Sequence, residues 1–224
     1  MDTEAGVLCL RSNAGSVVSD EGWRWLGVPG DEDEGVLDLA VAPVLDIGCG
    51  PGRHLRALAA RGIDALGVDL TPSVVRLARA MGSRVLEGSI FGPVPAPGSW
   101  ASALLLDGNI GIGGDPVALL SRASALLRPE GRILVELGPP GSPGQTRRVR
   151  LEHTTWNGPW FDWSAVGTTS IADVAMAAGL RVRRSWKKGG RWFARLGTSA
   201  VPELAPNPAR NAHGPGGRAQ VASG

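Results

Sequence analysis

The chain has 224 residues, of which 43% are hydrophobic and 20% are charged, and its formal net charge is +2. These values supply enough apolar side chains for a buried core and exclude a wholly disordered or fibrous chain. The small net charge lacks the basic character of a dedicated nucleic-acid-binding protein, and no apolar run approaches the roughly 20 residues of a membrane-spanning helix. We therefore expect neither a nucleic acid nor a membrane as partner.

Residues 1–30 show no clear helix or strand pattern, so we predict an irregular N-terminal segment. It begins with the acidic sequence MDTE and lacks the apolar core of a secretory signal. The two cysteines, Cys9 and Cys49, are too few for a disulfide framework and lack the spacing of a metal site. We therefore expect a cytoplasmic protein without a bound metal.

Helix and strand patterns alternate from residue 31 onward. The acidic run at 31–34 predicts the first turn of a helix, where the helix macrodipole favours acids. Such alternation gives right-handed crossovers and predicts an α/β fold: a doubly wound, mostly parallel seven-stranded sheet with helices on both faces, an antiparallel last strand and an extra hairpin after strand five. Apolar runs place its strands at 44–47, 64–69, 84–88, 101–106 and 132–137, followed by two strands joined at Gly189–Gly190.

We assign residues 31–198 to one domain. After Thr198 the sequence is rich in proline, glycine and alanine and has few large apolar residues. Such a segment buries too little apolar surface to offset the entropy of ordering it, so we predict a disordered C-terminal tail at 199–224.

The sequence VLDIGCGPGRH at 44–54 places Gly48, Gly50 and Gly52 directly after the first predicted strand of the sheet. Ligands of open parallel sheets bind beyond the carboxyl ends of the strands, where glycine lets the backbone approach closely. Asp69 ends the next strand, at the distance expected for a carboxylate that binds a ribose diol. This combination predicts a nucleotide-like ligand above the glycine run.

The order G-C-G-P-G differs from the G-x-G-x-x-G pattern of dinucleotide sites. Asp46 precedes the first glycine by two residues, and a carboxylate there would repel a diphosphate but attract a sulfonium or ammonium cation. The sequence therefore favours S-adenosylmethionine over a nicotinamide dinucleotide.

The sequences VLDIGCGPGRH, GVDLTPSVVRLAR and ALLRPEGRILVEL resemble the class I, Rossmann-like S-adenosylmethionine-dependent methyltransferases over roughly residues 35–197. By this resemblance Asp69 binds the ribose hydroxyls and Leu70 lies against the adenine. The family often has an acid at the position of Ser89, and a hydroxyl is a weaker hydrogen-bond acceptor than a carboxylate. The cofactor-binding residues that the resemblance implies are Asp46, Gly48, Cys49, Gly50, Gly52, Asp69, Leu70, Ser89, Ile90 and Asp107.

The glycine-rich stretch DGNIGIGGDP at 107–116 follows the fourth predicted strand of the sheet. Asp107 and Asn109 are candidates to hold the methionine amino group or to orient a substrate nucleophile, and Asp107 is a candidate catalytic residue. The alternative is a flexible turn without a chemical role. The stretch lacks the N/D-P-P-aromatic pattern of enzymes that methylate amino groups of DNA bases.

A tryptophan-rich hairpin is predicted at 146–164, with its turn at Asn157–Gly158. One interpretation is a lid over the substrate, to which Trp156, Trp160, Trp163 and, from the preceding loop, Asn109 contribute. The other is a small satellite core that covers a sheet edge. His153 in this hairpin is a candidate general base, beside Glu152 and Asp162.

Taken together, these features predict an S-adenosylmethionine-dependent methyltransferase that acts on a small molecule. The nucleophile would attack the methyl group in line, and catalysis would come mostly from alignment of the two reactants. A non-catalytic S-adenosylmethionine-binding module and a nicotinamide-dependent oxidoreductase are the alternatives. The sequence specifies neither the acceptor nor the oligomeric state.

Overall fold

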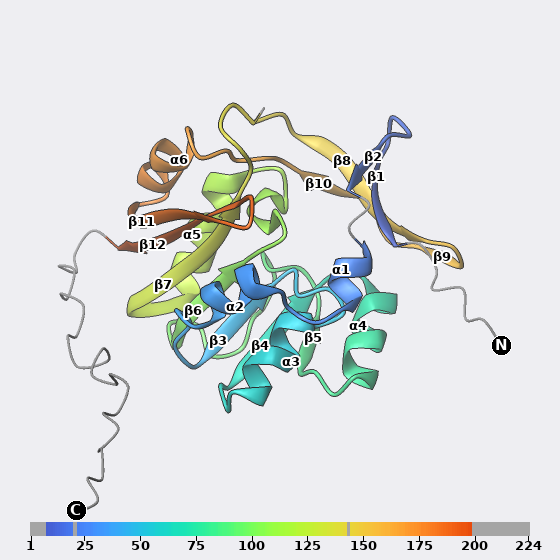
Figure 1. Cartoon of the computed structure of the whole chain (residues 1–224), viewed down its shortest axis with the longest axis horizontal. Coiled ribbons are helices and arrows are strands. Elements are labelled where there is room, and N and C mark those ends of the chain that lie inside the picture. The colour runs from blue at the N-terminus through green and yellow to red at the C-terminus, as the bar shows by residue number, and fades with distance from the viewer. Residues whose placement is uncertain (1–7, 20–21, 143, 199–224) are drawn as a thin grey trace, which may run out of the picture.

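The computed structural model describes residues 8–19, 22–142 and 144–198, which form two β-sheets and the helices around them (Figure 1). The larger sheet has seven strands in the order β11-β12-β7-β6-β3-β4-β5. Within it, β3 to β7 pair in parallel, and β12 is antiparallel to both β7 and β11. The predicted doubly wound α/β fold with an antiparallel last strand is therefore confirmed. Its strands are β3 (Val44–Ile47), β4 (Ala65–Asp69), β5 (Val85–Glu87), β6 (Trp100–Leu105), β7 (Leu127–Leu137), β11 (Leu180–Lys188) and β12 (Arg191–Thr198).

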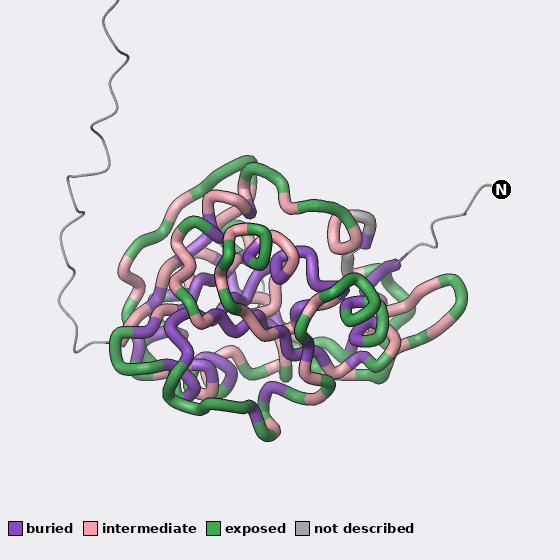
Figure 2. Tube along the Cα trace, turned by 90° about the horizontal axis from the view of Figure 1, so that it is seen from below, coloured by how far each residue is buried: buried purple, intermediate pink, exposed green. Residues whose placement is uncertain are grey.

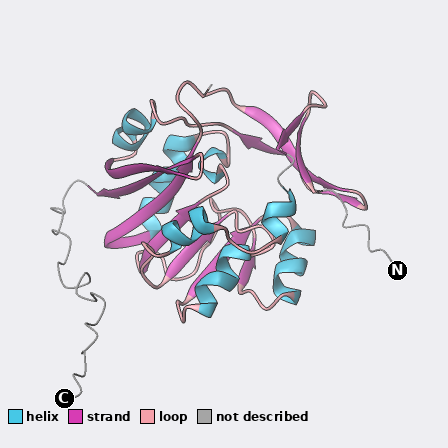
Figure 3. Cartoon of the chain, viewed as in Figure 1, coloured by secondary structure: helices cyan, strands magenta, loops and turns pink. Residues whose placement is uncertain are grey.

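Helices cover both faces of this sheet (Figure 3). On one face, α5 (Pro116–Leu126) and α6 (Ile171–Ala177) bury Leu119, Leu120 and Ile171 against the strands. On the other face, α2 (Asp31–Leu37), α3 (Arg53–Ala60) and α4 (Pro72–Ala80) pack against the sheet and one another. The central strands β3 and β6 are consequently buried on both sides, which explains their mostly apolar sequences. Figure 2 colours the buried residues purple along the chain trace.

The smaller sheet joins the N-terminal part of the chain to the insertion after β7. It is antiparallel throughout and has the order β10-β8-β1-β2, with β9 also paired to β8. Figure 1 shows it beyond the larger sheet, above α1 (Gly22–Leu26) and α4. Its strands are β1 (Cys9–Ser12), β2 (Val17–Ser19), β8 (Arg147–His153), β9 (Trp156–Asn157) and β10 (Phe161–Trp163).

Two sequence predictions differ from this arrangement. Residues 1–30 are not irregular in their described part, because β1 and β2 form strands and Leu10 pairs with Leu151. Such short strands give almost no local pattern, since their pairing partner lies far along the chain. The turn of the predicted hairpin lies at Thr154–Thr155 rather than at Asn157–Gly158. Gly158 still donates its N–H to the Leu151 carbonyl at 2.8 Å.

The predicted tail at 199–224, and residues 1–7 and 20–21 of the N-terminal segment, lie outside the described residues. None of the helices in the described part of the chain is long and apolar enough to span a membrane.

Candidate functional site

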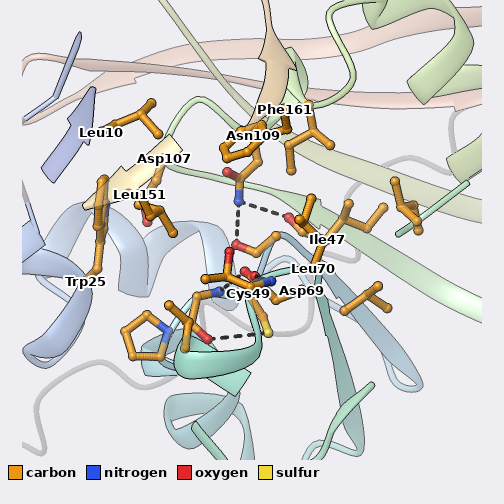
Figure 4. Close-up of a pocket in the computed structure, with 18 of the residues that line it drawn as sticks. Leu10, Trp25, Ile47, Cys49, Asp69, Leu70, Asp107, Asn109, Leu151 and Phe161 are labelled. Carbon is orange, nitrogen blue, oxygen red and sulfur yellow. Dashed lines mark hydrogen bonds between the residues drawn. The ribbon is translucent and has the colours of Figure 1, made fainter. Parts of the chain in front are cut away.

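A cavity lies beyond the carboxyl ends of β3, β4 and β6, between the larger and the smaller sheet (Figure 4). We call its two sides the loop wall and the sheet wall. The loop wall consists of residues 47–51, 69–71 and 88–90. The sheet wall consists of Leu8, Leu10, Val18, Leu151, Phe161 and Trp163. Trp25, Arg53, His54, Val68, Val74, Asp107, Asn109 and Ile112 complete the lining.

The glycines of the loop wall adopt left-handed backbone conformations, with φ of +71° at Gly48 and +55° at Gly50. A Cβ atom on Gly48 would lie 2.6 Å from Ile112 Cδ1 and 2.8 Å from Asn109 Nδ2, so close packing excludes a side chain there. A Cβ atom on Gly50 would meet nothing within 4 Å, because this residue faces open space. Gly52, with φ of +82°, is the N-cap of α3. The run thus gives the cavity a bare backbone surface at Gly50.

Asp69 connects the end of β4 to the glycine run. One carboxylate oxygen, Oδ2, accepts the Gly50 N–H at 3.0 Å, and the other, Oδ1, accepts the Thr71 N–H at 2.9 Å. Burial raises the pKa of Asp69, and these two N–H groups oppose that rise. The two carboxylate oxygens offer about four acceptor sites in all, and these two N–H groups occupy two of them.

The other predicted cofactor residues of the loop wall surround Asp69. Leu70 and the buried Ile90 present apolar side chains to the cavity. The Ser89 hydroxyl oxygen accepts the Phe91 N–H at 3.2 Å, which leaves its hydrogen available to a ligand. Burial raises the pKa of Cys49 well above its ordinary value, so this residue is a neutral thiol.

Asp46 lies behind the glycine run and is not among the lining residues. Its side chain is 1% exposed, and its Oδ2 atom has no hydrogen-bond partner in the described residues. Burial raises the pKa of Asp46 to about 6, even though His54 lies nearby with Nδ1 at 3.9 Å from Oδ2. A buried carboxylate next to the cavity, with one oxygen that accepts no hydrogen bond in the described residues, favours a cationic ligand.

A cluster of buried and partly buried ions lies at the same end of the sheet. The ion cluster consists of Asp33, Arg53, Asp107, Glu136 and Arg191. Arg53 donates to both oxygens of Asp107, at 2.7 and 2.9 Å, and also to Asp33. Arg191 donates to Asp33 at 2.6 Å and to Glu136 at 2.7 and 2.5 Å. The cluster therefore joins α2, α3, the loop after β6, β7 and the start of β12.

The ion cluster explains why the pKa of Asp33 is low and how Asp107 is held in position. Burial alone would raise the pKa of Asp33, but hydrogen bonds from His54 and Arg191 and the charge of Arg53 hold it well below its ordinary value. Asp107 has φ of +55°, and its N–H donates to Glu136 at 2.7 Å. Its carboxylate lines the cavity but also lies 3.3 Å from Arg191 and 3.5 Å from Arg24.

Asp33, Arg53 and His54 belong to the site but were not predicted from the sequence. The acidic run at 31–34 was interpreted as an ordinary first helical turn, although Asp33 within it is buried. Arg53 and His54 follow the glycine run directly, and this adjacency was the available signal. Both side chains are buried and line the cavity.

The predicted lid residues fall into two groups. Trp163 and Asn109 line the cavity, and Asn109 Nδ2 donates to the carbonyls of Ile47 and Gly48 at 2.9 and 2.8 Å. Trp156, Trp160 and His153 are not among the lining residues. The ring of His153 stacks on Trp156 with centroids 5.5 Å apart, and its Nδ1 lies 2.9 Å from the Thr155 hydroxyl. A catalytic role for His153 stays a prediction, and its position does not support it.

The residues present fit S-adenosylmethionine. The open surface at Gly50 gives a ligand room beside Asp69, whose oxygens can accept the two hydroxyls of a ribose. The apolar side chains of Leu70 and Ile90 suit a purine ring. The unpaired Oδ2 of the buried Asp46 provides negative charge for a cationic sulfonium or ammonium group.

Parts of the chain are similar in sequence to known methyltransferases. Residues 44–131 match the family model described as a methyltransferase domain. A ubiquinone biosynthesis O-methyltransferase of Xylella fastidiosa is 31% identical over 111 residues, which are 44% of this chain and 43% of that protein. A trans-aconitate 2-methyltransferase of Methylobacterium radiotolerans is 31% identical over 135 residues, which are 57% of this chain and 48% of that protein. The chain thus spans less than half the length of these curated relatives.

A solved structure is similar over a larger part of the chain. A methyltransferase of Bacteroides fragilis, determined with S-adenosyl-L-homocysteine, superposes with a TM-score of 0.71 at 21% identity. The match covers 86% of this chain and 87% of that protein, which shows that the two share a fold.

Proposed function

We propose that this chain is a class I S-adenosylmethionine-dependent methyltransferase that transfers a methyl group to a small-molecule acceptor, since residues 44–131 match the methyltransferase-domain model and the chain shares the fold of the Bacteroides fragilis methyltransferase. The observation that carries the proposal is the placement of Asp69 and the open backbone at Gly50 on one wall of a cavity whose opposite wall is built from other segments. The loop wall suits the donor, and the space in front of the sheet wall is available for an acceptor.

In this proposal the loop wall holds the donor. S-adenosylmethionine, when bound, supplies a methyl group on a positively charged sulfur. Asp69 accepts the ribose hydroxyls, Leu70 and Ile90 enclose the adenine, and the Gly48–Gly50 backbone lies along the methionine part. Asp46 stabilises the positive charge from behind the glycine run. These contacts hold the donor in one orientation relative to the sheet wall.

Catalysis then rests on alignment. Holding a nucleophile and a methyl group in line converts a bimolecular reaction into an effectively unimolecular one, which lowers the barrier by about 7–11 kcal/mol in favourable cases. Asn109 and Asp107 lie between the two walls and keep fixed positions through their hydrogen bonds to the chain. The Xylella fastidiosa relative is named as an O-methyltransferase, so oxygen nucleophiles are the first acceptors to test.

The test has two arms. Calorimetric titration with S-adenosylhomocysteine measures donor-site binding, and we expect a micromolar dissociation constant. Incubation of the protein with isotopically labelled S-adenosylmethionine and a metabolite extract, followed by mass spectrometry, should reveal new labelled small molecules. Donor binding without any labelled product would instead support a non-catalytic binding module. Retention of a nicotinamide dinucleotide by the purified protein would contradict the proposal.

A further inference from the structure

The sheet wall is apolar on the side that faces the cavity. Leu8 directly precedes β1, Leu10 lies within it two residues later, and Leu10 is directly opposite Leu151 of β8. Because side chains alternate between the faces of a strand, this spacing puts them all on one face. Phe161 and Trp163 continue the same face along β10.

The opposite face of the same strands is charged. Arg150 and Glu152 of β8 form an ion pair at 2.6 Å, and Arg11 of β1 also donates to Glu152. Arg148 is exposed on this face as well. The smaller sheet therefore separates an outer charged surface from an inner surface that suits a flat, apolar molecule.

The acidic and thiol side chains that line the cavity are poorly placed to act as bases. Cys49 is a neutral thiol, and the oxygens of Asp69 accept two backbone N–H groups on the loop wall. Both oxygens of Asp107 accept hydrogen bonds from Arg53, whose guanidinium keeps its charge at any physiological pH.

The remaining nitrogen-containing side chains do not supply a base either. His54 is 4% exposed, and each of its ring nitrogens lies near a carboxylate, with Nε2 at 3.6 Å from Asp33 and Nδ1 at 3.9 Å from Asp46. Asn109 donates its amide N–H groups to two backbone carbonyls, and an amide oxygen is not a base. Among the described lining residues, none presents a free base to the space before the sheet wall.

We propose that the acceptor is a flat aromatic molecule whose reacting oxygen is already ionised when it binds. This inference rests on the proposed methyl transfer. The acceptor oxygen forms a bond to the methyl carbon, the carbon–sulfur bond breaks, and its electron pair stays on the sulfur. No proton moves in this step, so no base is needed. The cost of burying the anion against apolar side chains is offset by the adjacent sulfonium charge.

The decisive experiment compares two acceptors that differ in acidity, 4-nitro-1-naphthol and the less acidic 1-naphthol, using the wild-type protein. The pH dependence of kcat/KM reports the ionisation of free enzyme and free substrate. We expect the midpoint of each profile to lie at the pKa of that acceptor in solution. The inference would be overturned if both acceptors gave the same midpoint, because a group of the protein would then be the base. It would also be overturned by equally efficient methylation of 4-nitro-1-naphthylamine.

A failure of this inference can be distinguished from a failure of the proposed function. If the protein binds S-adenosylhomocysteine and labels extract components but methylates neither naphthol, the aromatic acceptor class is wrong and methyl transfer stands. If it neither binds S-adenosylhomocysteine nor labels any component, the proposed function itself fails.

A second measurement tests the apolar wall. Leu10→Ala and Leu151→Ala each remove methyl groups from the cavity side, and we expect the naphthol KM to rise about tenfold. The matched control is Arg148→Ala, on the outer face of the same sheet, which should leave KM within about twofold. The dissociation constant of S-adenosylhomocysteine, measured first, shows that each variant is folded. Equal KM values in the leucine variants and the control would contradict the assignment of the wall.

Discussion

The two walls of the cavity are built in opposite ways. The loop wall comes from three consecutive strand–loop units between residues 44 and 90, and each unit carries its own local signal. The sheet wall joins Leu10 to Leu151, and its strands have three to seven residues. The wall that suits the donor is thus local and rigidly specified, whereas the wall that suits the acceptor depends on long-range pairing. Substitutions in the loop wall should therefore change donor affinity, whereas substitutions in the sheet wall should change methyl transfer to the acceptor.

The largest effect is expected at the ion cluster behind the loop wall. Asp33→Ala removes a buried partner of Arg53 and Arg191 and should lower stability by about 3–5 kcal/mol, because buried guanidinium groups lose compensation. Thermal unfolding measures this loss. The control is Glu34→Ala in the same helix, since Glu34 pairs with Arg61 at the surface, where such pairs contribute about 0–1 kcal/mol. Equal melting temperatures of the two variants would show that the cluster does not stabilise the fold.

Donor affinity should respond most to Asp69. Asp69→Ala removes an acceptor of two ribose hydroxyls, each charge-assisted hydrogen bond contributing about 1.5–3 kcal/mol, and we expect roughly a hundredfold weaker binding of S-adenosylhomocysteine. Calorimetry provides the value. Glu87→Ala is the matched control, because Glu87 ends the adjacent strand β5, pairs in register with Asp69 and does not line the cavity. A change below threefold in folded Asp69→Ala would remove Asp69 from the donor site.

Asp46 gives a pH-dependent effect of intermediate size. Burial raises its pKa from 3.8 to about 6, so the folded state holds its proton more tightly than the unfolded state. Its contribution to stability is therefore complete below pH 3.8 and is lost as the pH rises through 6. Asp46→Asn, which cannot ionise, should exceed the wild type in stability at pH 8 by about 1–3 kcal/mol, and this difference should shrink toward pH 4. Melting temperatures of the ligand-free proteins across this range test the sign.

Asp46→Asn should at the same time weaken donor binding at pH 8, since it removes negative charge beside the expected cation. Asp33 has the opposite pKa shift, so its contribution is present above its ordinary pKa and is lost only in acid. If Asp46→Asn were less stable than the wild type at pH 8, the interaction of the carboxylate with His54 would outweigh the cost of burying it.

Smaller effects are expected at the sheet wall. Trp163→Ala removes a ring from the cavity and should reduce methyl transfer about tenfold, while donor affinity changes less than about twofold. Trp160→Ala is its control, because Trp160 is 38% exposed and does not line the cavity. The transfer rates and donor affinities of both variants show whether Trp163 contacts the acceptor or belongs only to a satellite core. A large stability loss in both variants, with activity retained by the folded fraction, would favour the core.

The smallest effect is expected from the predicted tail. Truncation after Thr198 should leave the melting temperature and donor affinity unchanged, because residues 199–224 have few large apolar side chains to bury. Differential scanning calorimetry of both chain lengths checks this. A fall of several degrees would show that the segment docks on the domain.

The sequence allowed the larger sheet to be predicted because each of its parallel strands is followed by its own crossover. It did not allow the smaller sheet to be predicted, since nothing near Cys9–Ser12 indicates pairing with Arg147–His153. The hairpin turn was misplaced because Asn157–Gly158 is a strong local turn signal, yet β8 and β9 are joined at Thr154–Thr155.

The same distinction applies within the site. Gly48, Gly50 and Asp69 follow a short motif, so their placement on one wall could be predicted from spacing, whereas Gly52 of the same motif caps α3 and does not line the cavity. The ion cluster could not be predicted in this way. Asp33 accepts a hydrogen bond from Arg191, which is the first residue of β12 and lies 158 residues further along the chain. Asp33 has the sequence position of an ordinary acid in a first helical turn. Its burial could not be predicted without knowing that Arg191 lies beside it.

The pairing of β1 with β8 also sets an order of events during synthesis. A ribosome adds about 5–20 residues per second, so β1 emerges roughly seven to thirty seconds before β8, its pairing partner. During that interval the units from β3 to β7 can form with their own crossovers, while Leu8 and Leu10 have no apolar surface from β8 to cover them. The sheet wall is consequently enclosed only after the strands that carry the loop wall have been synthesised.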